Sequence, residues 1–316
     1  MTEQLVHDLQ RFKVNEKSIS SFFIGGGTPS TMAPKLYESF FQTLRPYLQD
    51  KAEITVEANP NSATKPWLEG MKSLGVTRIS FGVQSFFADK LTMLGRNHSA
   101  DQAKLAIQTA HDLGFKHLSL DLIYGTKLDT KKRLESEIAQ ALALPIDHVS
   151  SYALTLEENT PFANRQDIQN DSSSLARFFA QTLQSKGFEQ YEISNYGTYQ
   201  CQHNLGYWQH TPYLGIGCGA VGFDGQKRYY PHTNLEAYLQ TPLTCNEETL
   251  HVKDLQTEKL FLGLRSRTGI DPLLLTTTQQ QKTALLLQEK KLLQQGDRLY
   301  NPDFFLADEI ALFLME

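Results

Sequence analysis

The sequence predicts an α/β fold in which parallel strands and helices alternate and curl into a complete or partial barrel. Two observations carry this prediction. Short runs rich in β-branched and aromatic residues recur roughly every 30 residues, and stretches with apolar residues at helical spacing separate them. Most of the runs also end in a polar or glycine-rich cluster. Polar groups at the C-terminal ends of many strands are typical of a barrel mouth, whereas an open sheet gathers them in one crevice.

Each expected element follows from its local pattern. β-Branched and aromatic content predicts strands at 20–24, 53–57, 78–83, 117–123, 148–154 and 188–193. Apolar spacing predicts helices at 36–48, 67–74, 100–113, 131–144 and 174–186. After Gly225 the pattern changes to helices at 249–264, 279–293 and 306–315, with a turn at Gly296-Asp297 and a short strand at 298–300. We therefore expect a barrel domain over residues 1–248 and a small helical, winged-helix-like domain over 249–316.

Composition excludes several classes of protein. The 316 residues are 40% hydrophobic, and 30 Lys and Arg against 35 Asp and Glu give a net charge of −5, which argues against a nucleic-acid partner. No apolar run approaches the roughly 20 residues that cross a bilayer, and the N-terminus lacks the features of a signal peptide. Three widely spaced cysteines imply no disulfide framework. We therefore expect a soluble, globular, cytoplasmic protein without a membrane span.

The segment Gly25-Gly26-Gly27-Thr28-Pro29-Ser30 lies between an expected strand and an expected helix. Three glycines let the backbone approach a ligand closely, and exposed N–H and C=O groups can bind amino or carboxylate functions. The segment is neither the dinucleotide fingerprint nor a P-loop, since the required spacing and lysine are missing. The alternative is a plain flexible turn, in which Pro29 and Ser30 only start the helix.

Polar residues near other strand ends have the same ambiguity. A carboxylate at Glu57 suits a ligand's ammonium group or ribose hydroxyls, but a single such residue is more often a cap or a turn residue. Gln84, Arg96 and Asp121 are each weak signals alone. Their joint placement at the expected barrel mouth favours a binding site.

The segment 201–208, with the sequence CQHNLGYW, is a second concentration of unusual residues. His and Cys can ligate haem iron, and Tyr and Trp offer flat apolar faces to a macrocycle. The alternative is an aromatic loop over the barrel, with His203 bonded to backbone. The glycine-dense segment 213–220 suits close packing or the face of a buried ligand. The cysteine spacing matches no zinc site and no iron–sulfur run, so no metal ligands are assigned.

Taken together, these motifs resemble a known family. In order they are FFIGGGTPS (22–30), EANP (57–60), SFGVQS (80–85), LGR (94–96) and DLIYG (121–125). They are similar to the radical S-adenosylmethionine family of oxygen-independent coproporphyrinogen III oxidases and their haem-chaperone relatives. The segments YEISNY (191–196), 201–208, 213–220 and the tail 292–314 resemble the haem-chaperone branch, HemW. The resemblance covers nearly the whole chain.

The resemblance implies a partial (β/α)6 barrel with S-adenosylmethionine across its mouth. It places Gly26, Gly27 and Thr28 at the methionine amino group. It makes His203 the candidate haem ligand, framed by Asn204, Tyr207 and Trp208. S-adenosylmethionine would also be lined by Glu57, Gln84, Arg96, Asp121 and Ala153.

One departure from the family pattern matters. The family's first strand and its CxxxCxxC loop, whose thiolates hold a [4Fe–4S] cluster, have no counterpart here, since no cysteine precedes Cys201. We expect either that Met1 is an internal methionine of a longer protein or that this is a shortened variant. As written, the chain has no catalytic residues for reductive cleavage of S-adenosylmethionine.

The leading expectation is a haem chaperone-like protein that binds haem and S-adenosylmethionine and delivers haem to an unknown haem protein. The alternative is an oxygen-independent coproporphyrinogen III oxidase. Such an enzyme catalyses the radical oxidative decarboxylation of coproporphyrinogen III in porphyrin biosynthesis, and an upstream segment would supply its cluster. A third expectation is a fragment that folds poorly, because loss of the first strand uncovers a sheet edge.

Overall fold

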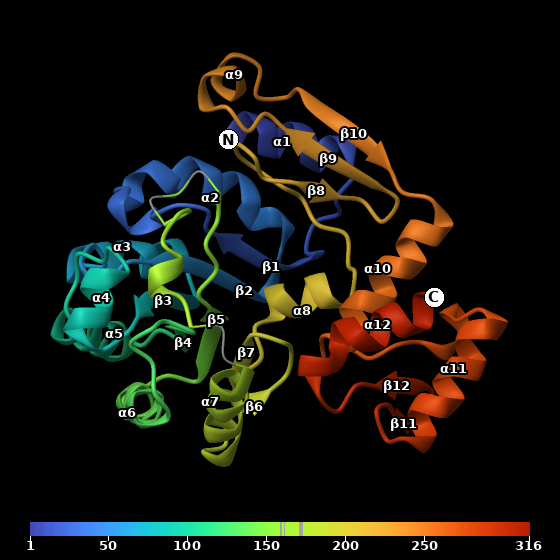
Figure 1. Cartoon of the computed structure of the whole chain (residues 1–316). Helices are drawn as coiled ribbons and strands as arrows, with labels where there is room; N and C mark the ends of the chain where they lie inside the picture. The colour runs from blue at the N-terminus through green and yellow to red at the C-terminus, as the bar shows by residue number, and fades with distance from the viewer. Residues whose placement is uncertain (159, 161, 171–172) are drawn as a thin grey trace. The chain divides into compact units, whose positions relative to one another are not determined.

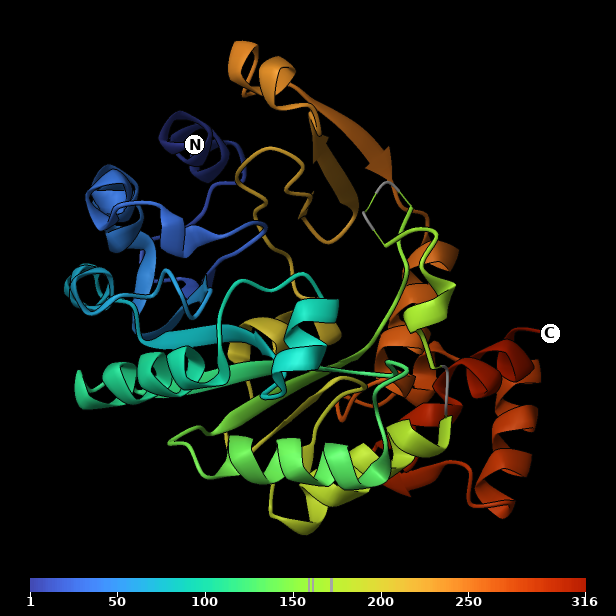
Figure 2. The ribbon, with the colours of Figure 1, turned by 60° about the vertical axis from the view of Figure 1, so that its left-hand side comes forward.

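One seven-stranded sheet dominates the computed structural model, which describes residues 1–158, 160, 162–170 and 173–316. Its strand order is β1-β2-β3-β4-β5-β7-β6. Strands β2 to β5 are parallel neighbours, whereas β7 is antiparallel to both β5 and β6. The sheet is curled (Figures 1 and 2), which confirms the predicted partial barrel. The strands are β1 (Ile19–Ile24), β2 (Leu48–Ala58), β3 (Arg78–Gln84), β4 (His117–Tyr124), β5 (His148–Ala153), β6 (Glu189–Gln190) and β7 (Asn195–Gly197).

The register of this sheet separates an apolar face from a polar one. Side chains of directly paired residues share a face, and alternate residues face opposite sides. One cross-strand row is Ala58, Phe81, Leu120, Val149 and Tyr196, all buried. The alternate residues of the same strands are mostly polar. Helices α3 (Lys65–Leu74), α5 (Ala100–Asp112), α6 (Lys131–Leu142) and α7 (Ser173–Ser185) connect these strands, as expected for βα units (Figure 2).

Local capping explains where these helices begin. Thr64 accepts a hydrogen bond from the Trp67 amide at the start of α3, and Ser99 with Gln102 forms a capping box on α5. The single helix predicted at 36–48 was wrong. That stretch is divided into η2 (Pro34–Tyr37), α2 (Glu38–Leu44) and η3 (Arg45–Tyr47), because Pro46 cannot continue an α-helix.

A second, three-stranded sheet has the order β10-β9-β8 and was not predicted. Its strands are β8 (Gly222–Phe223), β9 (Lys227–Pro231) and β10 (Cys245–Thr249), with α9 (Leu235–Gln240) between the last two. The sequence of β10, CNEET, is polar and almost wholly exposed, so it carries no hydrophobic strand signal. Helix α10 (Val252–Leu264) therefore begins three residues later than the helix predicted at 249–264.

The C-terminal helices share a hydrophobic core. Leu264 of α10, Leu292 and Ala311 are fully buried in it. The predicted turn is confirmed at Gly296, with a φ of 60°, between the short strands of a hairpin. The other elements here are η5 (Pro272–Leu274), α11 (Thr277–Gln288), β11 (Leu293–Gln295), β12 (Arg298–Tyr300), η6 (Phe304–Leu306) and α12 (Ala307–Met315).

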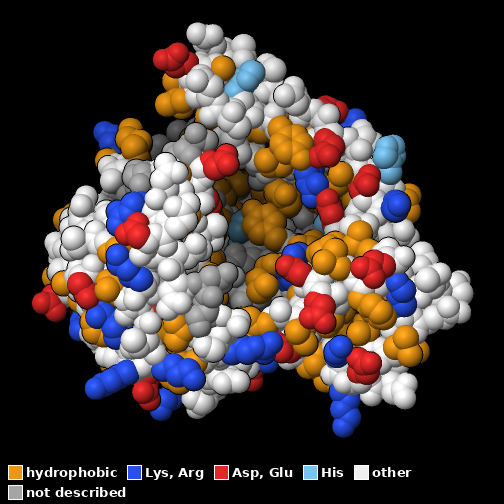
Figure 3. Space-filling model, in the orientation of Figure 1, with side chains coloured by type: hydrophobic (Ala, Val, Ile, Leu, Met, Phe, Trp, Pro, Cys, Tyr) orange, Lys and Arg blue, Asp and Glu red, His pale blue; other side chains and the backbone are white. Residues whose placement is uncertain are grey.

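The chain divides into two compact units that interleave in sequence. One comprises residues 1–20, 39–51 and 202–316, and the other residues 21–38 and 52–201. We call them the terminal unit and the sheet unit. The expected domain boundary after residue 248 stays a prediction. On the face shown in Figure 3, basic and acidic side chains are interspersed.

Candidate functional site

The glycine loop after β1 encloses a carboxylate of β2. Gly25, Gly26 and Gly27 are exposed, and the φ of Gly26 is 81°, which favours glycine. The Gly26 amide donates a hydrogen bond to the Glu57 carboxylate. A Cβ on Gly25 would lie 2.6 Å from Phe23 Cε1 and 2.9 Å from Glu57 Cδ, whereas one on Gly27 would meet nothing within 4 Å. The loop is therefore closed toward Glu57 and open on its other side.

The residues after the glycines fix this loop to the end of β2. Thr28 is half-buried and precedes the 3-10 helix η1 (Pro29–Thr31). The buried Ser30 Oγ accepts a hydrogen bond from the Asn59 amide at 3.0 Å and shares another with Ser62 Oγ at 2.6 Å. Ser30 is therefore more than a helix-start signal, because it joins two motifs that are far apart in sequence.

Sheet register brings a second carboxylate, Asp121, to the same polar face. Glu57 is paired with Ser80, and Ser80 Oγ donates a hydrogen bond to Asp121 Oδ1 at 3.3 Å. Burial raises the pKa of Asp121 to about 6, although Arg78 and hydrogen bonds from Ser150 and Ser80 oppose the shift. Burial, followed by the charge of Asp121, also raises the pKa of Glu57. The two carboxylates thus lie within electrostatic reach of each other, and for Asp121 the effect of burial outweighs the opposing charges of Arg78 and Arg96.

The other expected cofactor residues lie at neighbouring strand ends. Gln84 ends β3 with a φ of 66°, is buried, and has its Nε2 beside Gly82. Arg96 is half-buried after the short helix α4 (Ala88–Met93); burial lowers its pKa, and the charge of Asp121 acts in the other direction. Ala153 ends β5 and is paired with Tyr124 of β4. The structure thus brings Glu57, Arg96 and Asp121 together and places Gln84 and Ala153 on the adjoining strands.

These residues fit S-adenosylmethionine chemically. The cofactor carries an ammonium group and ribose hydroxyls, which can donate hydrogen bonds to carboxylates, and a sulfonium, whose positive charge carboxylates attract. Two incompletely compensated carboxylates and an open glycine loop offer those acceptors together with backbone groups. Glu57 and Asp121 would hold the donors of the cofactor, and Gly26, Gly27 and Thr28 its amino-acid head.

The segment 201–208 contains the second set of candidate residues. It forms the short helix α8 (Gln202–Trp208), in which none of the residues is buried. His203 Nε2 shares a hydrogen bond of 3.0 Å with Tyr207 Oη, and the rings meet edge to face. Asn204 and Trp208 are half-buried, and Tyr207 is 41% exposed. His203 is half-buried, and an imidazole beside an aromatic ring is a residue type that fits a haem-iron ligand.

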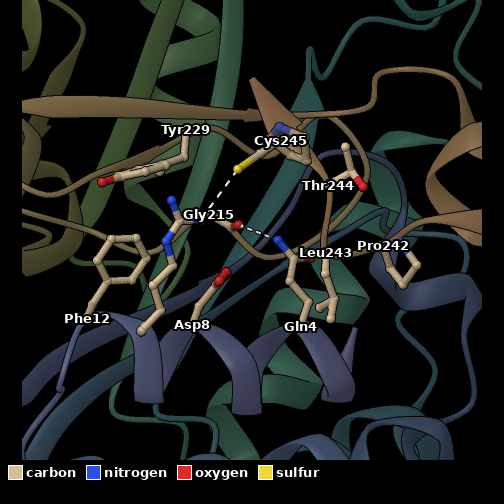
Figure 4. Close-up of a pocket in the computed structure, with 12 residues that line it drawn as sticks. Gln4, Asp8, Phe12, Gly215, Tyr229, Pro242, Leu243, Thr244 and Cys245 are labelled. Atoms are coloured by element: carbon tan, nitrogen blue, oxygen red, sulfur yellow. Dashed lines mark hydrogen bonds between the residues drawn. The ribbon is translucent and has the colours of Figure 1, made fainter. Parts of the chain in front are cut away.

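The glycine-dense segment 213–220 is held within the same unit by Gln4 of helix α1 (Thr2–Arg11). Gln4 Nε2 donates a hydrogen bond to Gly215 O at 3.1 Å, and Gln4 Oε1 accepts from Gly217 N at 3.0 Å and Tyr238 Oη at 2.7 Å. Figure 4 shows Gln4 and Gly215 facing each other in a small pocket with Tyr229 and Cys245. Tyr213, at the start of the segment, packs edge-on against Tyr207 at 4.7 Å between centroids. Gln4 therefore supports the surroundings of α8.

Sequence reasoning missed a chain of buried polar groups on the polar face of the sheet. His148 lies 3.3 Å from Arg78 Nη2 and 2.7 Å from Tyr191 Oη. At the other end, Glu53 accepts hydrogen bonds from Cys201 Sγ at 3.2 Å and from Tyr199 Oη at 2.6 Å, and the Cys201 amide donates to Tyr191 Oη at 3.3 Å. The available signal was periodicity: Glu53, Arg78 and His148 each occupy the polar phase of a strand. These hydrogen bonds fix the position of Cys201, the residue before α8.

Within the part of the chain that the structure describes, no group of three His, Cys, Asp or Glu residues could hold a metal ion. The cysteines differ in environment, since Cys201 is buried, Cys218 exposed and Cys245 half-buried. The residues present therefore do not fit an iron–sulfur cluster, and no chemical step is derived through one. No helix in the described ranges is both long and apolar enough to span a bilayer.

Fold and motifs define a radical S-adenosylmethionine domain. The Radical SAM superfamily matches residues 2–140. The structure is similar to that of coproporphyrinogen III oxidase HemN from Escherichia coli, a radical SAM enzyme, with a TM-score of 0.79 over 99% of this chain and 81% of that one. The two sequences are 17% identical, so this likeness concerns the fold alone.

Similar sequences show to which family of radical S-adenosylmethionine proteins the chain belongs. The heme chaperone HemW of Haemophilus influenzae is 40% identical over 231 residues, which cover 70% of this chain and 60% of that protein. The heme chaperone HemW of Lactococcus lactis is 32% identical over 282 residues, covering 85% of this chain and 74% of that protein. The chain belongs to the HemW heme chaperone family. It spans 60% of the Haemophilus protein's length, which is less than two thirds.

Proposed function

We propose that this protein binds haem through α8, with His203 as the iron ligand, and passes it to a haem-accepting protein. The observation that carries the proposal is the imidazole of His203 beside the Tyr207 ring, on a helix in which no residue is buried. Asn204 and Trp208 complete the proposed site. The names of the sequence relatives, which are heme chaperones, support the same assignment.

The sheet unit would bind S-adenosylmethionine as a second ligand. Glu57 and Asp121 would accept hydrogen bonds from the ammonium and hydroxyl groups, and the glycine loop would approach the methionine head. Gln84, Arg96 and Ala153 would border the same ligand. When bound, the cofactor supplies a sulfonium-activated adenosyl group, and the residues of this chain bind and orient it. The three free thiols suit a reducing compartment, which supports a cytoplasmic location.

Radical decarboxylation of coproporphyrinogen III is the competing expectation. The likeness to HemN concerns the fold alone, and the residues present do not fit the cluster that this chemistry needs. This reaction would require an upstream segment that supplies the cluster ligands.

Haemin titration followed by visible absorbance tests the proposal. We expect saturable binding with a spectrum typical of a histidine-ligated haem, and a His203→Ala variant with weaker affinity and an altered Soret band. The matched control is His111→Ala, since His111 is an exposed histidine on α5 of the sheet unit. An unchanged spectrum and affinity in His203→Ala would exclude this ligand.

Transfer is tested separately from binding. Haem-loaded protein is mixed with an apo haem protein, and the acceptor's own absorbance is followed. We expect the acceptor to take up haem faster from this protein than from a control in which haemin is bound to albumin. Haem retained by this protein over the same period would contradict delivery.

A further inference from the structure

A buried ionic cluster lies between helices α4 and α6, outside the residues assigned so far. Lys90 Nζ donates hydrogen bonds to Asp129 Oδ1 at 2.7 Å and to Glu137 Oε2 at 3.0 Å. All three side chains are 0% exposed. A buried ammonium group is tolerated only with such partners, and removing one partner leaves an uncompensated charge.

The cluster connects the loops that follow two neighbouring strands. Ser85 comes directly after Gln84, and its hydroxyl donates to Glu137 and accepts the Phe87 amide at 3.0 Å. Asp129 Oδ2 accepts hydrogen bonds from the amide and the hydroxyl of Thr126, at 2.8 and 2.9 Å. The loop after β3 and the loop after β4 are thus fastened to the same three charges.

Helix α4 also lies between two of the proposed cofactor residues, Gln84 and Arg96. The Arg96 amide donates to Leu91 O of this helix at 2.9 Å. His98 Nε2 is hydrogen-bonded to Val83 O at 2.9 Å, which holds the segment after Arg96 to the end of β3. A shift of α4 would therefore move the backbone at both ends of the segment.

We propose that Lys90 is a positioning residue for S-adenosylmethionine: by holding α4 to Asp129 and Glu137, it fixes the places of Gln84 and Arg96. The proposal rests on the proposed function, because it takes the cofactor to bind beside these two residues. Lys90 itself is fully buried and acts only through them.

A second ion pair joins the same two helices and provides a matched control. Arg133 of α6 donates to both carboxylate oxygens of Asp89, from Nη1 at 3.0 Å and from Nη2 at 2.7 Å. The Asp89 side chain is 54% exposed. Exposed pairs contribute little, so Asp89→Asn should leave the position of α4 unchanged.

The test compares Lys90→Met with Asp89→Asn by backbone hydrogen exchange and by calorimetric titration with S-adenosylmethionine. In Lys90→Met we expect the amides of Arg96 and Thr126 to exchange at least about tenfold faster and the affinity to fall by about tenfold or more. Haemin affinity should stay within about twofold of wild type, because a local shift in the sheet unit spares α8. Asp89→Asn should resemble wild type in all three measurements.

Several outcomes would overturn the proposal. Unchanged exchange at Arg96 and Thr126 would reject it whether or not the cofactor binds. Equal losses of haemin and cofactor affinity would indicate general destabilisation instead of positioning. If Lys90→Met does not fold, Glu137→Gln, which keeps the Asp129 contact, should show the same pattern with smaller changes. A wild-type chain that binds haemin but not S-adenosylmethionine would count against the proposed cofactor, and the exchange result would then show only whether Lys90 fixes the segment.

Discussion

The two candidate sites are built in different ways. The carboxylates Glu57 and Asp121 come from strands whose register fixes their spacing, and the glycine loop is joined to them through Ser30 and Asn59. His203 and Tyr207 come from a short helix in which no residue is buried. The first site is therefore arranged before a ligand arrives. The second lies on a short helix whose residues are half-buried or exposed, so it is less enclosed than the first.

This difference agrees with the proposal that the protein retains S-adenosylmethionine and releases haem. Preorganised groups bind tightly because little ordering remains to be done on association. Under the proposal, α8 would supply a single ligand to the iron and hold haem more weakly, as haem delivery requires. Changes in the sheet should therefore affect S-adenosylmethionine, and changes around α8 should affect haemin.

The largest effect is expected from Asp121→Asn. Loss of a charged acceptor should weaken S-adenosylmethionine binding by about 10- to 100-fold, with haemin binding unchanged. The affinity of the wild-type chain should rise with pH through about 6, because the pKa of Asp121 is raised to about 6 and the ionised form binds the cationic ligand. Calorimetric titration from pH 5 to 8 measures both effects. Wild-type binding that is independent of pH would contradict the role of Asp121.

Glu192→Gln should stabilise the sheet unit at alkaline pH. Burial raises the pKa of Glu192 to about 7 from 4.5, and one carboxylate oxygen has no hydrogen-bond partner among the described residues. The folded state therefore holds this proton more tightly than the unfolded chain, and the stability that it contributes is lost as the pH rises from about 4.5 to 7. The variant should lack this loss and be more stable by about 1–3 kcal/mol at pH 8.

Urea unfolding at pH 5 and pH 8 provides the comparison. The two proteins should differ least at pH 5, where Glu192 is protonated. A variant that is less stable than wild type at pH 8 would show that the charged carboxylate has a partner.

Gln4→Leu tests the support of the second site. The change removes three hydrogen bonds, to Gly215, Gly217 and Tyr238, so we expect a loss of about 1–3 kcal/mol in the free energy of unfolding. Haemin affinity should fall several-fold, and the affinity for S-adenosylmethionine should not. Thr2→Ala, on the same helix but only half-buried, is the control for both titrations. Equal haemin affinity in Gln4→Leu and Thr2→Ala would show that Gln4 of α1 does not support the haem site.

The smallest effect, and one of opposite sign, is expected from Tyr207→Phe. His203 Nε2 must leave the Tyr207 hydroxyl before it can bind iron through that nitrogen. Removing the hydroxyl keeps the aromatic ring and removes a competing hydrogen bond of about 0.5–1.5 kcal/mol. Haemin affinity should therefore rise by up to about tenfold, as measured by absorbance titration. A fall of similar size would show that the hydroxyl helps to hold the haem.

The sequence by itself determined the alternation of strands and helices, because residue periodicity and capping are local properties. The strands at 78–83 and 117–123 and the helices with Ser, Thr or Gly at their ends were confirmed almost to the residue. The row of polar strand ends was also readable, because βα units direct those ends to one edge. Strand β10 was missed, since an exposed polar strand is specified by its pairing with β9 and not by its own composition.

Only the tertiary structure decided which polar residues meet. The contact of Cys201 with Glu53 joins residues 148 positions apart, and that of Lys90 with Glu137 joins residues 47 apart. In the sequence Glu53, Lys90 and Glu137 read as ordinary surface or strand residues, and Cys201 reads as part of a candidate haem segment. Burial makes them partners, because a charge or a polar group without solvent must find its counterpart in the protein. Sequence patterns specify the elements, whereas packing of those elements pairs the charges that position the candidate site.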